Sequence, residues 1–99
     1  MKAMLVENEK LVWSEVENPA AKENEIVIKV YAAALNRADL LQKKGTYPSP
    51  AGWPQWPGLE VSGTVFEMGS EAAEKSGLKK GDKVCALLGG GGYAEYVSV

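Results

Sequence analysis

The stretch Glu25-Ile26-Val27-Ile28-Lys29-Val30-Tyr31 decides the fold class of this chain, because four of its seven residues are β-branched. Such side chains pack well on the pleated surface of a sheet, so the stretch predicts a strand. Outward from it, short apolar or alternating runs predict further strands at residues 3–6, 11–16, 61–68, 83–88 and 93–99. Only Glu7-Asn8-Glu9-Lys10 separates the first two, which are therefore predicted to form a hairpin.

The clearest helical signal begins shortly after the central strand. The range Asn36 to Lys44 predicts a short helix, with Asn36 as its N-cap and Gly45 as its end. We expect Leu35, Leu40 and Leu41 to face the core together. The remaining stretches predict a surface loop at 17–25, a loop with four prolines at 46–58 and a turn-rich connection at 69–80.

Several short strands with bends marked by glycine predict a mainly β fold, a small closed or partly open β-barrel with one or two short helices. A length of 99 residues fits one domain, residues 1–99, with a modest core. Within the 61–68 strand, Gly63 marks a place where the backbone must pack closely or bend.

The composition excludes several classes of function. The formal charge is −2 and the charges are interspersed, so the basic face of a nucleic-acid binder is missing. No apolar run approaches the ~20 residues of a membrane span. One cysteine and no histidine leave neither a disulfide framework nor a Cys/His set for structural zinc. We therefore expect a protein of the reducing cytoplasm, with no nucleic acid or membrane among its partners.

The glycine run needs separate treatment, because Gly89-Gly90-Gly91-Gly92-Tyr93-Ala94 formally fits the G-x-G-x-x-A dinucleotide fingerprint. That fingerprint requires a following helix, whose N-terminus receives the pyrophosphate. Residues 93–99 alternate as a strand instead, so we reject the match. The run is predicted to form a tight turn, or a flexible edge of the cleft.

Cysteine and tryptophan are interpreted mainly as packing residues. Cys85 lies in an apolar strand and is predicted to be a buried structural thiol. Trp13 is predicted to lie in the core. Trp53 and Trp56 stand in the proline-rich loop, and we favour packing into the domain over contact with an aromatic substrate.

Two short segments carry the strongest functional signal, Ala34-Leu35-Asn36-Arg37-Ala38-Asp39-Leu40 and Pro57-Gly58-Leu59-Glu60-Val61-Ser62-Gly63. They resemble the segments that line the active site of medium-chain dehydrogenases/reductases. The resemblance continues through Gly81-Asp82-Lys83-Val84 and Gly91-Gly92-Tyr93-Ala94-Glu95-Tyr96, and covers essentially the whole chain. It implies that the barrel is the GroES-like, partly open β-barrel of the catalytic domain in that superfamily.

The same resemblance points to a branch without zinc. In zinc-using members, a metal-binding Cys stands at the place of Asn36 and a metal-binding His at the place of Leu59. Leucine cannot bind a metal, and a neutral amide is a poor zinc ligand. The pattern is therefore similar to the zinc-free quinone oxidoreductases, which use NADPH. The implied activity is metal-independent hydride transfer to a quinone or an α,β-unsaturated carbonyl.

Asn36 and Tyr47 are the candidate catalytic residues, and with Arg37 they are the candidate contacts to the cofactor. An amide or phenol donor can stabilise the oxygen that gains negative charge when hydride arrives. From spacing alone Asn36 is more readily a helix cap, and Tyr47 a loop residue packed on Pro48; the resemblance reverses both preferences. For Asn36 both roles can hold, because the backbone can turn while the side chain faces the cleft.

Arg37, Asp39 and Glu60 are ionisable residues that the fold is expected to bring together. A partly buried carboxylate needs a charge or hydrogen-bond partner, and Arg37 is the obvious one for Asp39 and Glu60. The resemblance leaves a second role open for Arg37, contact with a cofactor phosphate, which the basic residue at this place reaches in some relatives.

The resemblance also implies a larger parent enzyme, in which a Rossmann domain absent from this chain holds NADPH. This chain alone is expected to be inactive and monomeric, and its parent a homodimer. Two other functions stay open. One is a free-standing GroES-like binding or assembly module. The other is the barrel of an enoyl reductase that acts on acyl thioesters.

Overall fold

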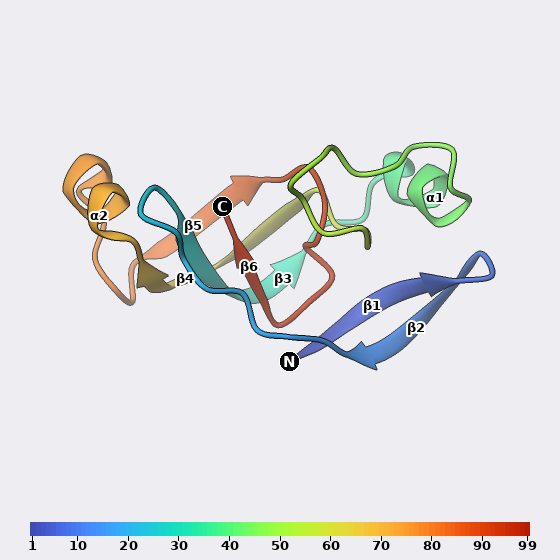
Figure 1. The fold of residues 1–99 in the computed structure, drawn as a ribbon, viewed down its shortest axis with the longest axis horizontal. Coiled ribbons are helices and arrows are strands. Elements are labelled where there is room, and N and C mark those ends of the chain that lie inside the picture. The colour runs from blue at the N-terminus through green and yellow to red at the C-terminus, as the bar shows by residue number, and fades with distance from the viewer.

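The computed structural model describes all residues 1–99 as six strands and two short helices (Figure 1). The elements are β1 (Lys2–Glu7), β2 (Lys10–Glu15), β3 (Ile26–Ala33), α1 (Arg37–Lys43), β4 (Glu60–Met68), α2 (Ser70–Ser76), β5 (Lys83–Leu87) and β6 (Tyr96–Ser98). Strands β1 and β2 form an antiparallel pair, and the other four strands form a second antiparallel sheet in the order β5-β4-β3-β6.

The two sheets meet without closing, so the predicted mainly β, partly open GroES-like barrel is confirmed. Their junction is a single bridge between Ala3 and Ala94, beside which the Met4 N–H donates to the Tyr93 carbonyl at 2.8 Å. The molecule is elongated, 41 Å by 22 Å by 20 Å, with α2 at one end and α1 and the β1–β2 hairpin at the other (Figure 1).

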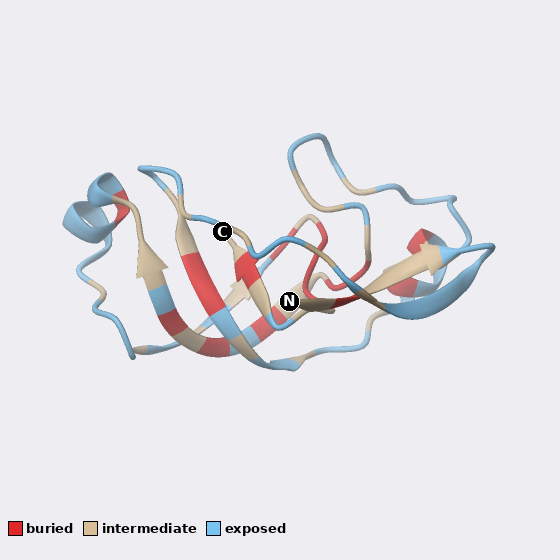
Figure 2. Ribbon diagram, turned by 60° about the horizontal axis from the view of Figure 1, so that its bottom comes forward, coloured by how far each residue is buried: buried red, intermediate tan, exposed pale blue.

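The core lies against the four-stranded sheet. Ile28, Val61, Leu88 and Val97 form its buried cluster, against which Trp53 packs. Buried positions follow the middle of this sheet and the segment beside it, while both helices and the hairpin are largely exposed (Figure 2). The close approach expected at Gly63 is confirmed, because a Cβ there would lie 2.0 Å from the carbonyl oxygen of Lys29.

The predicted hairpin is confirmed, and its turn explains the register. Asn8 and Glu9 have φ angles of 50° and 62°, and Glu7 pairs with Lys10. Two consecutive positive φ values give the turn a twist that matches the twist of the strands. The prediction that Trp13 lies in the core is wrong, because it is 53% exposed on β2. Only β1 pairs with that strand, which leaves it at an edge of its sheet.

Strand β5 corrects a second burial prediction. Cys85 is exposed, not buried, because β5 is an edge strand whose side chains alternate. Val84 and Ala86 turn toward the core, whereas Leu87 is 80% exposed on the side of Cys85. The apolar sequence of the strand concealed this alternation.

The helices also differ in part from expectation. Helix α1 lies where it was predicted, but its buried residues are Asp39 and Gln42. Leu35, Leu40 and Leu41 are 86%, 58% and 39% exposed, so the prediction that they face the core is wrong. The predicted connection at 69–80 contains α2, which ends at Gly77 with a φ of 69°.

At the C-terminal end, β6 spans only Tyr96–Ser98 of the 93–99 strand that was predicted. Before it, residues 93 and 94 leave the four-stranded sheet and run beside β1. None of the helices has the length and apolar character needed to span a membrane.

Candidate active site

A cavity of about 370 Å³ opens at the end of the molecule that carries α1 and the hairpin. Its apolar wall is made by Leu11, Leu35, Leu40 and Pro57. Its polar lining residues are Asn36, Arg37, Asp39, Lys43 and Tyr93. The structure thus brings two of the residues predicted from sequence, Asn36 and Arg37, into one cavity, whose size is typical of small-molecule sites.

Asn36 begins helix α1 and also lines this cavity, while its catalytic role stays a prediction. Its backbone is extended, with φ −128° and ψ 153°, and it begins α1 as the N-cap residue. Its side-chain amide bonds to strand β4, where Nδ2 donates to Oε1 of Glu60 at 3.1 Å. An amide nitrogen has two hydrogens, so one donor remains after the bond to Glu60.

Asp39 is the most buried polar residue of this site, at 7% exposure. Its Oδ2 accepts the backbone N–H of Asn36 at 2.8 Å and also the hydroxyl of Tyr93. Burial raises the pKa of the Tyr93 hydroxyl above its ordinary value, and the hydrogen bond to Asp39 and the charge of that carboxylate raise it further. Tyr93 therefore remains a protonated donor throughout the neutral pH range.

These contacts correct the prediction for Arg37. No ion pair joins Arg37 to Asp39 or to Glu60, and its side chain is exposed. The physical reason is that Tyr93 and Asn36 already supply the hydrogen bonds that the two carboxylates need. Arg37 is thus left at the rim of the cavity, where its charge is available to an anionic ligand.

Tyr93 is a site residue that the sequence did not indicate as one. Its backbone N–H donates to the Pro57 carbonyl at 3.0 Å, and the neighbouring N–H of Gly92 donates to Gly58 at 3.0 Å. A Cβ on Gly58 would lie 2.4 Å from the Tyr93 nitrogen. The two glycines therefore let the 57–58 and 92–93 segments pack closely side by side. This placement directs the Tyr93 side chain toward Asp39. Within the glycine run, residues 89 and 90 bend the chain without forming the predicted tight turn, and the N–H groups of Gly91 and Gly92 donate to the carbonyls of Trp56 and Gly58 at 2.8 Å and 3.0 Å.

Tyr47 lies in the loop that follows α1 and is 48% exposed. It is not among the residues that line the cavity with Asn36. The structure does not bring these two candidate catalytic residues together, and the role of Tyr47 stays a prediction.

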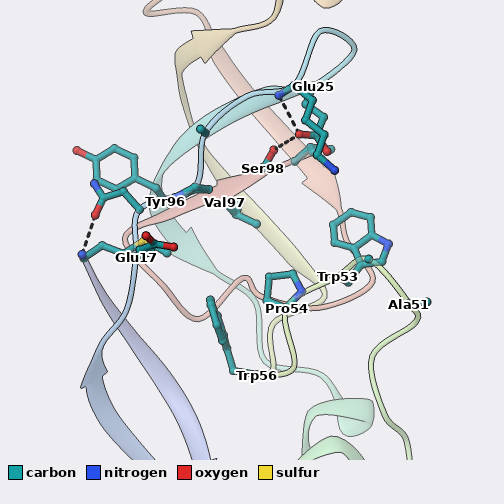
Figure 3. Close-up of a pocket in the computed structure, with 16 residues that line it drawn as sticks. Glu17, Glu25, Ala51, Trp53, Pro54, Trp56, Tyr96, Val97 and Ser98 are labelled. Atoms are coloured by element: carbon teal, nitrogen blue, oxygen red, sulfur yellow. Dashed lines mark hydrogen bonds between the residues drawn. The ribbon is translucent and has the colours of Figure 1, made fainter.

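A larger cavity of about 650 Å³ lies between β6 and the loops around residues 17–22 and 51–56 (Figure 3). Trp53, Pro54 and Trp56 form one side of it, and Tyr96 and Val97 lie across from them (Figure 3). Two of its polar side chains are bonded to each other within the fold. The carboxylate of Glu25 accepts from Lys22 N–H and from the Ser98 hydroxyl, at 3.0 Å and 3.1 Å.

The packing role favoured for the tryptophans agrees with their contacts. Trp53 packs on the core, and the Trp56 indole N–H donates to the Gly91 carbonyl at 3.0 Å. Trp56 thereby ties its loop to the glycine segment that carries Tyr93.

The donor set around Asn36 does not fit a catalytic zinc ion. Such a site uses three protein ligands drawn from Cys, His, Asp and Glu, and the structure contains no group of three such residues placed to hold a metal. At the two places where the resemblance expects ligands stand an amide already bonded to Glu60 and the aliphatic side chain of Leu59.

Comparison with known proteins defines the class of protein to which this fold and site belong. Residues 22–99 match the family described as the alcohol dehydrogenase GroES-like domain, and the chain is a member of that family.

Among its relatives is the quinone oxidoreductase of Sus scrofa, which is 39% identical over 84 residues, or 84% of this chain and 25% of the relative. The acryloyl-coenzyme A reductase of Metallosphaera sedula is 39% identical over 90 residues, or 89% of this chain and 26% of the relative. This chain therefore spans about a quarter of the length of these relatives.

Solved structures agree with this relationship. The quinone oxidoreductase of Thermus thermophilus, whose complex with NADPH has also been determined, superposes with a TM-score of 0.75 at 34% identity. The similarity covers 100% of this chain and 30% of that one. The chain thus corresponds to the GroES-like domain of the medium-chain dehydrogenase/reductase superfamily.

Proposed function

We propose that this chain is the substrate-side domain of an NADPH-dependent reductase that transfers hydride to a quinone or an α,β-unsaturated carbonyl without a metal. The observation that carries the proposal is the Asn36 amide, which Glu60 holds in a cavity walled by leucines. The quinone oxidoreductase relatives, one of them solved with NADPH, support it.

Asn36 has the chemistry that this reaction needs. Hydride addition to a conjugated carbonyl puts negative charge on the carbonyl oxygen, and a fixed donor near that oxygen lowers the barrier. The bond to Glu60 uses one hydrogen of the Asn36 amide and orients the other. The apolar side chains of Leu11, Leu35 and Leu40 pack on a flat substrate and exclude water, which strengthens the remaining hydrogen bond.

The cavity also fits the nicotinamide end of the cofactor. Its leucine wall suits a flat ring, and two cations at its edge, Arg37 and Lys43, suit an anionic phosphate. When bound, NADPH supplies the hydride. The residues of this chain hold the acceptor, and another domain of the parent protein binds most of the dinucleotide. We further propose that the parent is a cytoplasmic homodimer.

Activity is expected to be independent of metal. Treating the full-length protein with a chelator should leave kcat and KM unchanged within about twofold, because Asn36 and Leu59 cannot hold a catalytic zinc. Elemental analysis of protein purified in metal-free buffer checks this directly. Zinc at one equivalent per chain, with activity lost on its removal, would contradict the prediction.

Tyr47 is proposed to donate a second hydrogen bond to the substrate oxygen once the parent protein closes on its ligands. Tyr47→Phe should then lower kcat/KM by about tenfold, as expected for loss of one hydrogen bond to a charged oxygen. Tyr31→Phe is a suitable control, because Tyr31 is 68% exposed on β3 and lines neither of the two cavities. Equal activity of the two variants would show that Tyr47 donates no hydrogen bond to the substrate.

A second candidate substrate is an acyl thioester conjugated to a double bond, which the relative named acryloyl-coenzyme A reductase supports. A panel of quinones, enones and enoyl thioesters, each with NADPH and with NADH, separates the two. The highest kcat/KM on a quinone or simple enone with NADPH supports the first candidate. Preference for the thioester supports the second, and no turnover of any member would overturn both.

A further inference from the structure

We propose that Tyr93 is a positioning residue of this site: by holding Asp39, it fixes the start of α1 and with it the amide of Asn36. The inference rests on the proposed function, because it explains how the donor of that reaction is kept in place. Three hydrogen bonds connect these residues. The Tyr93 hydroxyl and the backbone N–H of Asn36 both donate to Asp39 Oδ2, and the side-chain amide of Asn36 donates to Glu60.

Tyr93 is well suited to this task because its backbone is held from two sides. Its N–H donates to Pro57 at 3.0 Å, and its carbonyl accepts from Met4 on β1 at 2.8 Å. The close backbone contact at Gly58 adds a steric restraint. The phenol thus extends from a rigid junction of three chain segments, and a rigid support holds a functional group more precisely than a free loop does.

Asp39 depends strongly on the Tyr93 hydroxyl. Its Oδ2 receives two donors, whereas its Oδ1 is buried without any hydrogen-bond partner. A buried charged group that loses a donor pays a large desolvation cost, so it moves or draws in water. Without the phenol, Asp39 would retain only the N–H of Asn36, and a shift of Asp39 would displace Asn36 itself.

The effect on catalysis should appear in kcat and not in KM. Tyr93 lines the cavity, but its hydroxyl is engaged by Asp39 and its ring remains in Tyr93→Phe, so ground-state binding is kept. The oxygen that gains charge in the transition state instead meets a donor that is displaced or mobile. Misplacement of a catalytic group by a fraction of an ångström costs about tenfold or more.

The test compares Tyr93→Phe with Tyr96→Phe in the full-length protein. Tyr96 is the matched control, because its ring packs on Phe66 with centroids 4.8 Å apart and its hydroxyl makes no hydrogen bond within the protein. Tyr93→Phe should lower kcat about tenfold with KM within about twofold, and Tyr96→Phe should change neither. In NMR spectra, the side-chain amide signal of Asn36 should shift or broaden in Tyr93→Phe alone.

Asp39→Asn provides a second route if Tyr93→Phe fails to fold. It keeps the shape of the side chain but removes the charge that attracts both donors, so kcat and the Asn36 signal should change in the same way. Where both variants fold, the double variant should be no slower than the slower single variant, because both changes break one chain of contacts. Independent, multiplying effects would overturn the inference.

The outcomes separate this inference from the proposed function. If the wild-type protein reduces its substrate and Tyr93→Phe keeps full kcat, the inference fails while the proposed function stands. If the wild-type protein reduces nothing, the proposed function fails, and the Asn36 amide signal alone decides whether Tyr93 positions Asn36. An Asn36 signal unchanged in Tyr93→Phe overturns the inference in either case.

Discussion

Gly58→Ala is expected to lower the free energy of unfolding by about 3 kcal/mol, the largest stability effect that we predict for a single methyl group. Gly58 has a φ of 116°, where a side chain is strained. The added Cβ would lie 2.4 Å from the Tyr93 nitrogen and 2.5 Å from Cα of Gly92. These are backbone atoms tied back to Pro57 and Gly58 by hydrogen bonds, so they cannot move aside cheaply.

Urea unfolding followed by tryptophan fluorescence measures this loss, and Gly77→Ala is its matched control. Gly77 also has a positive φ, 69°, but a Cβ there meets nothing within 4 Å. The control should therefore lose only about 1 kcal/mol, the cost of the backbone conformation alone. If the two variants lost the same stability, the close packing of the 57–58 and 92–93 segments would be contradicted.

Asn36→Ala is expected to lower kcat/KM of the full-length protein by about 10²-fold, the usual cost of removing one oxyanion donor. The substitution removes the amide that Glu60 orients and leaves the charged oxygen of the transition state without its partner. Steady-state kinetics with the preferred substrate of the panel measure the change.

Asn36→Ser separates catalysis from helix capping, since serine is a good N-cap residue whose shorter side chain carries no amide. Both variants lose the bond to Glu60, but only serine can cap α1, so the serine variant should be more stable than the alanine variant by about 1 kcal/mol and yet be as slow. Full activity in Asn36→Ser would mean that Asn36 serves only to begin α1, and the assignment of the donor would be wrong.

Elements with strong local signals could be predicted from the sequence, and so could two residues of the candidate site. The β-branched run of β3, the two-residue turn of the hairpin and the Asn36 cap are each determined by neighbours in the chain. Asn36 and Arg37 were found through the resemblance, and the structure places both at one cavity.

The wrong predictions concern which side of a strand or helix is buried, because tertiary packing decides which side other elements cover. Trp13 and Cys85 lie on β2 and β5, and each of these strands has a neighbour on one edge only. The sequence of an apolar strand does not tell an edge position from a central one. Likewise α1 buries Asp39 and exposes Leu40, since the partner for its inner face is a hydroxyl.

Tyr93 was missed because its partner is distant in the chain. It stands 54 residues after Asp39, and the alternation of residues 93–99 concealed the point where the chain leaves the sheet. A usable signal was nevertheless present: a tyrosine directly after four glycines must be placed by backbone contacts, and Gly58 lies in the other motif of the site.

The most direct test of the account is to follow the hydride itself. The full-length protein, in metal-free buffer, is given an α,β-unsaturated ketone and NADPH deuterated at its transferable position. The account predicts that deuterium appears at the β-carbon of the reduced ketone, that the solvent supplies the α-proton, and that Asn36→Ala slows the transfer by about 10²-fold. A product without deuterium, transfer that needs added zinc, or equal rates for the wild type and Asn36→Ala would contradict it.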